Sequence, residues 1–400
     1  MLHIEKKTRA YALKNAIAHD GTAMQGPVIS SLFNEGLKKS DVGKHAKKIS
    51  EIILEVNALG LEKQKKEFEK LEKEVHERPA REGLAELPDV PKSGVVMRFA
   101  PSPSGPFHIA HAIVFSLNYL YVKKYGGKLY LRIEDTNPEN IYPKAYKMLG
   151  EEAKWLSDGK AEVVVQSDRM PLYYEYAEKL INKSSAYVCT CSSEDFKKFA
   201  DGKKNCPCRK LSAKENIERW KKMLDNKFGF GGGEAVLRFK SDMKHKNPAM
   251  RDFPLARINL TKHPRQGNKY RVWPLMNLAV ATDDIEMKMT HIIRGKDHRD
   301  NAERQSMIFK VLNKKFPWTA FLGRINFKDM ELSSTQMRKD IEAKKFSGWD
   351  DKRLPTIASL KKQKYFPEAF WKLAEQMGLA ENDKVMSREE FFQLLNTFNK

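Results

Sequence analysis

Long apolar runs are missing from the sequence. No stretch of its 400 residues approaches the roughly 20 consecutive apolar residues of a membrane-spanning helix. The first residues, Met1–Arg9, are mostly charged or polar and hold no apolar segment of signal-peptide length. We therefore predict a cytoplasmic protein that makes no contact with a membrane.

Cysteine is also scarce. The four cysteines form two C-x-C pairs, Cys189 with Cys191 and Cys206 with Cys208, and 14 residues separate the pairs. In a reducing compartment such a cluster favours metal binding over disulfides. Four thiolates match the tetrahedral preference of zinc, so the sequence predicts a Zn²⁺ site. Four reduced, metal-free cysteines are the alternative.

Acidic residues are outnumbered by basic ones. The chain has 73 Lys and Arg against 52 Asp and Glu, which gives a net charge of +21. Such a charge favours a polyanionic partner such as nucleic acid, although scattered lysines also serve solubility. The glycine run Gly229–Glu234 is not a phosphate-binding loop, because no Gly-Lys-Ser/Thr follows it. We expect a flexible turn at this place.

The stretch Val95–Ala112 has the features of a phosphate site. Its first residues read as a buried strand, prolines and a glycine end the strand, and apolar residues resume with helical spacing from Ile109. His108 and His111 lie three residues apart at the start of this helix, near its unpaired backbone N–H groups. A helix N-terminus attracts anions, so the pattern predicts phosphate binding. Two hydrogen-bonded core histidines are the alternative.

A second strand follows in Gly126–Asn137. A glycine turn leads into an alternating segment that ends at Glu134 and Asp135. Strand, helix and strand in this order predict a parallel βαβ unit, whose ligands bind beyond the carboxyl ends of the strands. Read on their own, the two acids are candidates for helix caps or magnesium ligands.

Several motifs resemble those of one family. Arg98–His111 looks like the "HIGH" signature of class I aminoacyl-tRNA synthetases, in the form used by glutamyl- and glutaminyl-tRNA synthetases. Arg132–Thr136 matches the family's R-I-E-D-T element, and Glu331–Ile341 falls at the position of its KMSKS loop. Tyr11–Ala23 is similar to the N-terminal extension of archaeal glutamyl-tRNA synthetases. The resemblance implies an α/β fold with a Rossmann-type parallel sheet, an acceptor-stem and zinc insertion, an N-terminal helical domain and a C-terminal helical segment.

The resemblance also assigns roles to residues. Catalysis falls to His108, His111, Ser333, Arg338 and Lys339. ATP, with Mg²⁺ bridging its phosphates, is assigned to Pro101, Ser102, Pro103, Ser104, Gly105, His108, Ala110, His111, Leu332, Ser333 and Ser334. The amino-acid substrate is assigned to Arg98, Glu134, Met276, Arg294 and Asp297, with Glu134 at its α-amino group and Arg294 at its γ-carboxylate.

Three of the departures from the family pattern bear on catalysis or on the substrate. Ala110 replaces the signature glycine, Met276 replaces a tyrosine of the substrate pocket, and Gln336 replaces the lysine of the second signature. We expect Arg338 and Lys339 to supply the charge that Gln336 lacks. The departures make a paralogue that binds RNA with weak catalysis an alternative to an active enzyme.

The motifs divide the chain into predicted segments. They are an N-terminal helical domain (1–83), a linker (84–94), the first half of the catalytic domain (95–185), an acceptor-binding insertion (186–262), the second half of the catalytic domain (263–345) and a helical stem-contact segment (346–400). We expect the chain to end before the anticodon-binding barrels of the family.

The resemblance predicts a glutamate–tRNA ligase of archaeal type, a monomer that uses ATP, L-glutamate and tRNA(Glu). A glutaminyl-tRNA synthetase shares almost every motif and is the nearest alternative. An enzyme of the glutamyl-queuosine type would explain a short C-terminus but not the N-terminal domain. Whether tRNA for glutamine is also charged with glutamate is left open.

Overall fold

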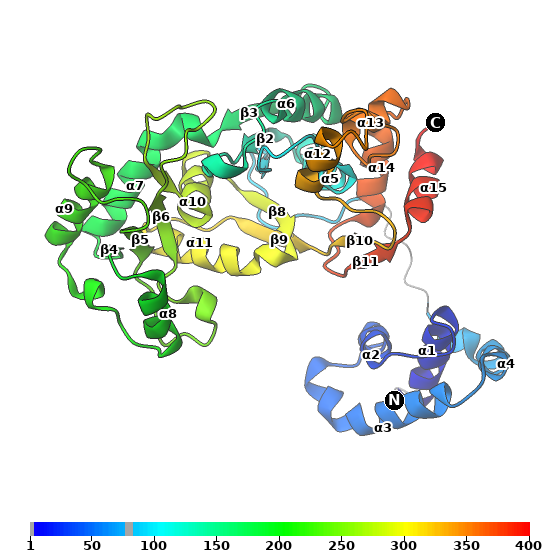
Figure 1. Cartoon of the computed structure of the whole chain (residues 1–400). Helices are drawn as coiled ribbons and strands as arrows, with labels where there is room; N and C mark the ends of the chain where they lie inside the picture. Colours follow the sequence, from blue (N-terminus) through cyan, green and yellow to red (C-terminus); the bar gives the residue numbers. More distant parts are fainter. Residues whose placement is uncertain (1–3, 77–82) are drawn as a thin grey trace. The chain divides into compact units, whose positions relative to one another are not determined.

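The computed structural model describes residues 4–76 and 83–400 of the chain (Figure 1). The chain divides into two compact units, Met1–Ala80 and Arg81–Lys400. The predicted boundary at residue 83 adjoins residues 77–82, which lie outside the described part. Every helix of the described residues is too short or too polar to cross a membrane.

The first unit is helical, as the sequence predicted. Its helices are α1 (Ile4–Ala18), α2 (Gln25–Asn34), α3 (Val42–Asn57) and α4 (Leu61–Leu71). In α3 the apolar residues Ile49, Ile52, Ile53 and Val56 recur every three or four positions, so all four are buried on one face of the helix. Ile49, Ile53 and Val56 belong to a core that also holds Leu13 and Leu32.

The centre of the second unit is a parallel three-stranded sheet in the order β1-β2-β3. The strands are β1 (Val95–Phe99), β2 (Gly127–Ile133) and β3 (Ala161–Val165), connected by α5 (Ile109–Tyr125) and α6 (Ala145–Leu156). The start of β2 requires glycine: a Cβ on Gly127 would lie 2.0 Å from the carbonyl oxygen of Val95, and its φ of +110° is unfavourable for other residues. The predicted βαβ unit is confirmed.

A second parallel pair continues this layer. β8 (His291–Gly295) and β9 (Trp318–Leu322) pair in parallel, with α10 (Met276–Glu286) before them and α11 (Arg299–Val311) between them. The backbone N–H of Thr290 donates to the carbonyl of Val96 at 3.0 Å, so β8 starts beside β1. The carboxyl ends of β1, β2 and β8 therefore open on one side.

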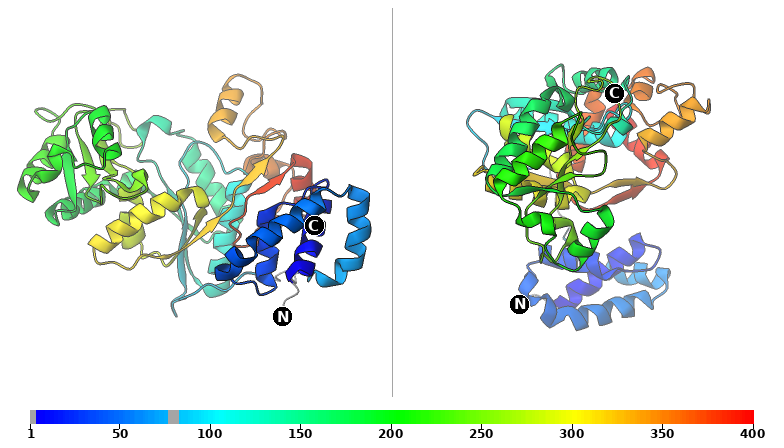
Figure 2. Two further views of the ribbon diagram at one scale, coloured as in Figure 1. Left: turned by 90° about the horizontal axis from the view of Figure 1, so that it is seen from below. Right: turned by 60° about the vertical axis from the view of Figure 1, so that its left-hand side comes forward.

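The insertion is a separate antiparallel sheet in the order β4-β5-β6-β7. Its elements are α7 (Met170–Asn182), which leads into it, β4 (Ala186–Cys189), α8 (Ser193–Asp201), α9 (Ala213–Leu224), β5 (Val236–Phe239), β6 (Pro254–Ile258) and β7 (Val272–Pro274). Within the second unit, these elements lie at one end and the C-terminal helices lie at the other (Figures 1 and 2).

The C-terminal segment contains one strand that was not predicted. After β9 the catalytic part continues with β10 (Ile325–Phe327) and α12 (Ser334–Glu342), and the C-terminal segment contains α13 (Ile357–Lys362), α14 (Pro367–Met377), β11 (Lys384–Met386) and α15 (Arg388–Phe398). β11 pairs in parallel with β10. The C-terminal segment is therefore tied to the catalytic part by a strand as well as by helices.

The segment predicted as a linker, 84–94, packs against the second unit. Leu87 is buried, and its backbone N–H donates to the Tyr125 hydroxyl at 3.0 Å. The carbonyl of Pro88 lies 2.8 Å from Nε2 of His291. Distant side chains therefore hold the predicted linker in place.

Candidate active site

A cavity of about 510 Å³ lies at the carboxyl ends of β1, β2 and β8. This is the size of a site for one or two small ligands. Of the predicted site residues, it is lined by Arg98, Pro101, Ser102, Ser104, Ala110, His111, Glu134, Met276, Arg294 and Asp297. Its lining does not include Pro103, Gly105, His108, Leu332, Ser333, Ser334, Arg338 or Lys339.

The two histidines stack at the N-terminus of α5. Their rings are 3.6 Å apart, and Nδ1 of His108 accepts the backbone N–H of His111 at 3.4 Å. Because this nitrogen is an acceptor, a neutral His108 carries its proton on Nε2. Burial lowers the pKa of His111 to about 4, and burial together with His111 lowers the pKa of His108. Both imidazoles are therefore neutral near pH 7.

A buried acidic side chain stabilises the turn that carries His108 and His111, which we call the histidine turn. Glu152, on α6, is 4% exposed and accepts the backbone N–H of Phe107 at 2.6 Å. It also accepts the backbone N–H of Ala358, at the start of α13. Burial raises the pKa of Glu152 to about 8. One side chain thus connects the residue before His108 to the C-terminal segment.

We expect the protonation of Glu152 to make stability depend on pH. The folded chain holds this proton up to about pH 8, whereas the unfolded chain releases it near its ordinary pKa of 4.5. This contribution to the free energy of unfolding is present below the unfolded value and is lost as the pH rises through about 8. Glu152→Gln should flatten the dependence in denaturant unfolding between these pH values. Glu152→Ala should cost about 1–3 kcal/mol, because the Phe107 N–H loses its acceptor.

The control for this prediction is Glu178→Gln, a change of an exposed glutamate on α7 that does not act on Glu152. It should leave the pH dependence as it is in the unaltered chain. An identical pH profile for Glu152→Gln and the unaltered chain would contradict the prediction.

The serine-rich loop is the predicted second signature, Glu331–Ile341. It lies against the turn that carries the two histidines but does not line the cavity. A Cβ built on Gly105 would be 2.8 Å from the Trp349 ring and 3.2 Å from Cβ of Ser334, so a larger residue at position 105 would displace the loop. Ser333 caps α12 by accepting the backbone N–H of Gln336 at 3.2 Å. The Arg338 guanidinium lies 5.8 Å from the Tyr142 ring centroid. The ATP-binding role of the loop stays a prediction.

A backbone bridge joins the same turn to the segment after the loop. His108 pairs with Thr356 in an antiparallel bridge. The backbone N–H of Ile109 donates to Pro355, and that of Ile357 donates to Phe107. The first signature region is therefore held to the segment after the second signature by main-chain hydrogen bonds.

The floor of the cavity is a network of buried charges. Asp284, on α10, accepts from Nε and Nη2 of Arg98 at 3.2 Å and from Nη1 of Arg132 at 2.6 Å. Arg132 also donates to Glu134 at 3.1 Å. Burial raises the pKa of Glu134, while Arg132 and Arg98 oppose that rise. Asp135, the second acid of the motif, instead accepts from Ser167 and faces away from the cavity lining.

Arg294, unlike Arg98 and Arg132, forms no ion pair with a carboxylate of this network. It is 8% exposed, and its Nη1 donates to the amide oxygen of Gln305 at 2.8 Å. Its buried Nε has no hydrogen-bond partner among the described residues. Burial and Arg98 lower its pKa to about 10, so Arg294 stays protonated at neutral pH. A buried cation without a carboxylate partner is an unsatisfied group that an anionic ligand would complete.

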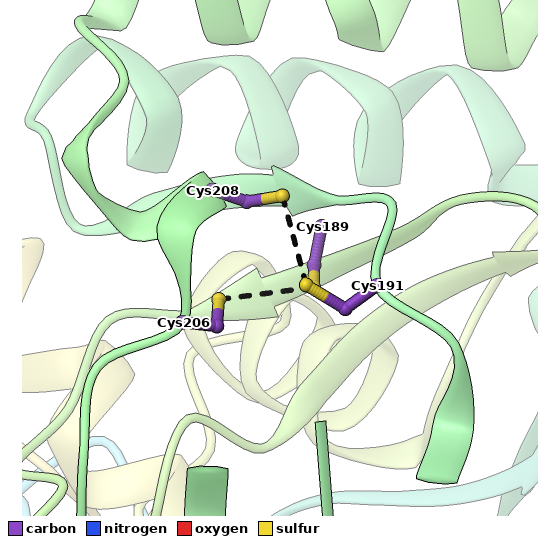
Figure 3. Close-up of side chains that lie close together, drawn as sticks. All are labelled: Cys189, Cys191, Cys206 and Cys208. Carbon is purple, nitrogen blue, oxygen red and sulfur yellow. Dashed lines mark hydrogen bonds between the residues drawn. The ribbon is translucent and has the colours of Figure 1, made fainter. Parts of the chain in front are cut away.

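The predicted cysteine cluster is present in the insertion (Figure 3). All four sulfur atoms lie within 4.8 Å of one another, and the pairs Cys189–Cys206 and Cys191–Cys208 are each 3.9 Å apart. Sulfur atoms around a tetrahedral zinc are ~3.8 Å apart, given Zn–S bonds of ~2.3 Å. Nη1 of Arg219 lies 3.5 Å from the Cys208 sulfur, a contact that favours a thiolate. The four residues therefore fit a zinc ion.

Sequence reasoning missed four residues of the site: Glu152, Asp284, His298 and Gln305. His298 lines the cavity, and burial and Arg294 lower its pKa. Two adjacent acids in an otherwise apolar helical segment, Asp283 and Asp284, were a usable signal of a buried charge network. Glu152 and Gln305 carry no local signal, because only the tertiary fold brings them to the site.

The parallel sheet, its antiparallel insertion and a histidine turn at the sheet's open edge are the architecture of a class I synthetase. The family described as "tRNA synthetases class I (E and Q), catalytic domain" matches residues 94–397. The chain therefore belongs to this family, and the predicted fold class and class of enzyme are confirmed.

Relatives cover almost the whole chain. The glutamate–tRNA ligase of Methanocaldococcus jannaschii is 42% identical over 98% of this chain and 70% of its own length. That of Pyrococcus furiosus is 42% identical over 96% of this chain and 69% of its own length. The crystal structure of the glutamate–tRNA synthetase of Elizabethkingia anophelis superposes with a TM-score of 0.54 and 21% identity, over 75% of this chain and 69% of that one, and supports the fold alone.

Proposed function

We propose that the chain is an ATP-dependent glutamate–tRNA ligase. In the first step the α-carboxylate of glutamate attacks the α-phosphorus of ATP, an oxygen–phosphorus bond forms, and pyrophosphate leaves. In the second step a ribose hydroxyl at the 3′ end of tRNA(Glu) attacks the activated carbonyl and AMP leaves. The names of the archaeal relatives and the family match support this reaction.

The histidine turn serves the first step. Two neutral imidazoles at a helix N-terminus are hydrogen-bond donors that meet the charge developing on the phosphates without carrying competing charge of their own. Positioning both substrates in one cavity supplies the remaining rate enhancement. The magnesium that accompanies ATP would neutralise part of the phosphate charge. Ser333, Arg338 and Lys339 are proposed to act on the triphosphate from the adjoining loop.

Charge balance at the cavity floor favours glutamate over glutamine, and this single observation carries the choice. The arginines Arg98, Arg132, Arg169 and Arg294 face the carboxylates Glu134, Asp283 and Asp284, so one positive charge remains. Each of the other three arginines pairs with a carboxylate, which leaves the uncompensated charge on Arg294. The γ-carboxylate of a glutamate substrate would neutralise this charge and accept two hydrogen bonds from the guanidinium. The substrate's ammonium group would lie at Glu134.

ATP–pyrophosphate exchange tests the proposal. The purified chain should catalyse exchange with glutamate and tRNA(Glu), and much more slowly with glutamine and tRNA(Gln). Preference for glutamine would indicate a glutaminyl-tRNA synthetase. Binding of tRNA without exchange under either condition would indicate a paralogue that has lost catalysis, the reading that Ala110, Met276 and Gln336 motivate.

The insertion 186–262 is proposed to contact the acceptor end of the tRNA. Lys244 and Lys246 are exposed there and available to phosphates. Arg238, another basic residue of the insertion, instead stacks on the Phe196 ring at 3.4 Å and donates to the Asp252 carbonyl. We therefore assign Arg238 to the fold of the insertion. We place the reaction in the cytoplasm, where tRNA and ATP meet.

A zinc ion at Cys189, Cys191, Cys206 and Cys208 is part of the proposal. It would cross-link the end of β4 to the segment before α9 and so stiffen the insertion. The four thiols come from these two segments and converge on one point (Figure 3).

We expect purified protein to contain about one zinc ion per chain, and Cys206→Ser to lose most of it. Three remaining ligands hold the metal more weakly because one coordination bond is missing. Elemental analysis after dialysis measures the zinc content. Ser193→Ala, beside the same cluster, is the control and should keep its zinc. Zinc-free protein that is fully folded and active would contradict the prediction.

A further inference from the structure

The hydrogen-bond partner of the buried Arg294 is a neutral residue, Gln305. Gln305 lies on α11, is fully buried and touches Arg294 directly. A glutamate at this position would have the same size and would form an ion pair with the guanidinium. The chain instead presents an uncharged amide to the one arginine at the cavity floor that has no carboxylate partner.

The orientation of the Gln305 amide is fixed from its other end. Its Nε2 donates to Oδ1 of Asn277 at 3.3 Å, so its oxygen faces Arg294. Asn277 is itself buried and follows Met276, a residue of the cavity lining. Two neutral amides in series thus hold the guanidinium. A guanidinium has five N–H donors, and the Gln305 oxygen accepts from only one nitrogen of Arg294. Other N–H groups of Arg294 therefore remain for a ligand.

We propose that Gln305 is a specificity-determining residue that positions Arg294 without neutralising it, so that the pocket selects an amino acid with a side-chain carboxylate. The inference rests on the proposed function. The other charged groups acting on Arg294 are Arg98, Arg132, Asp284 and Glu134, and they already pair among themselves. A carboxylate at position 305 would therefore neutralise the Arg294 guanidinium, which is proposed to bind the side-chain carboxylate of the substrate.

Gln305→Glu is the direct test. We expect kcat/KM for glutamate in ATP–pyrophosphate exchange to fall by roughly 30-fold or more, since the substrate carboxylate would be buried beside a cation that is already paired. The value for glutamine should fall much less, so the glutamate-to-glutamine ratio drops. Titration calorimetry of glutamate should show the same loss of affinity.

Gln305→Met separates charge from positioning. It keeps the size and neutrality of the side chain but removes the acceptor, so Arg294 loses orientation and keeps its charge. The values for glutamate should fall while the preference for glutamate is retained. Gln393→Glu, an exposed change on α15, is the matched control for added charge and should alter neither value.

Asn277→Asp guards against misfolding of Gln305→Glu. It places a carboxylate one hydrogen bond further from Arg294, and the ratio should fall in the same direction by a smaller factor. A thermal melt shows which variants are folded. An unchanged ratio in folded Gln305→Glu, or in folded Asn277→Asp if the former does not fold, overturns the inference. If the unaltered chain activates neither amino acid, the proposed function fails instead.

Discussion

Replacing His111 by alanine should slow adenylate formation by roughly 100-fold or more, with a much smaller change in KM for ATP. His111 lines the cavity, and its Nδ1 has no partner among the described residues. Its ring is held in place by His108 and by Phe99 and Phe107 at 5.5 and 5.9 Å between ring centroids. A fixed donor interacts most strongly with the charge of the transition state, so kcat should carry the loss. Pre-steady-state measurement of pyrophosphate release tests this.

His111→Asn and His19→Ala serve as comparisons. Asparagine keeps a donor near the same place and should recover part of the rate. His19 is exposed in the first unit and should be replaceable without effect. An alanine variant at position 111 that retains the full rate would remove the histidine turn from the chemistry.

Arg294→Ala should lower kcat/KM for glutamate by roughly 100-fold or more, because the γ-carboxylate loses its only uncompensated cation and stays desolvated. Arg294→Lys should restore only part of the loss, since an ammonium group lacks the planar pair of donors. The same exchange assay, run over a range of glutamate concentrations, gives both constants.

Arg304→Ala is the control for this variant. Arg304 lies on α11, the helix that follows β8, donates to the carbonyl of Ala249 and is not part of the cavity lining. It should leave glutamate use unaltered. Equal effects of the two alanine variants would mean that Arg294 acts through stability and not through the substrate.

Local sequence predicted the parts of the site that a single segment encodes. Prolines, Gly105 and the histidine spacing placed a turn and a helix start, and the structure has both at that place. The cysteine pairs likewise meet across a short loop. In each case the residues that matter are close in the chain, so spacing determines geometry.

Long-range partners escaped the same reasoning. Gln305 contacts Arg294 only because α11 packs against the end of β8. Glu152 accepts the backbone N–H of Phe107, which is far from it in the sequence. β11 is a strand of only three residues, too short for an alternating pattern to show. The partners of the segment 84–94, Tyr125 and His291, are far away in sequence, so local sequence could not reveal these contacts.

The main-chain bridge between His108 and Thr356 bears on the order in which the enzyme matures. During synthesis the residues around His108 leave the ribosome long before their backbone partners at Pro355 and Ile357 exist. The nascent turn carries its imidazoles but has open hydrogen-bonding groups until more than half of the chain has followed. Catalytic competence therefore arises late, when the C-terminal segment docks on the turn between β1 and α5.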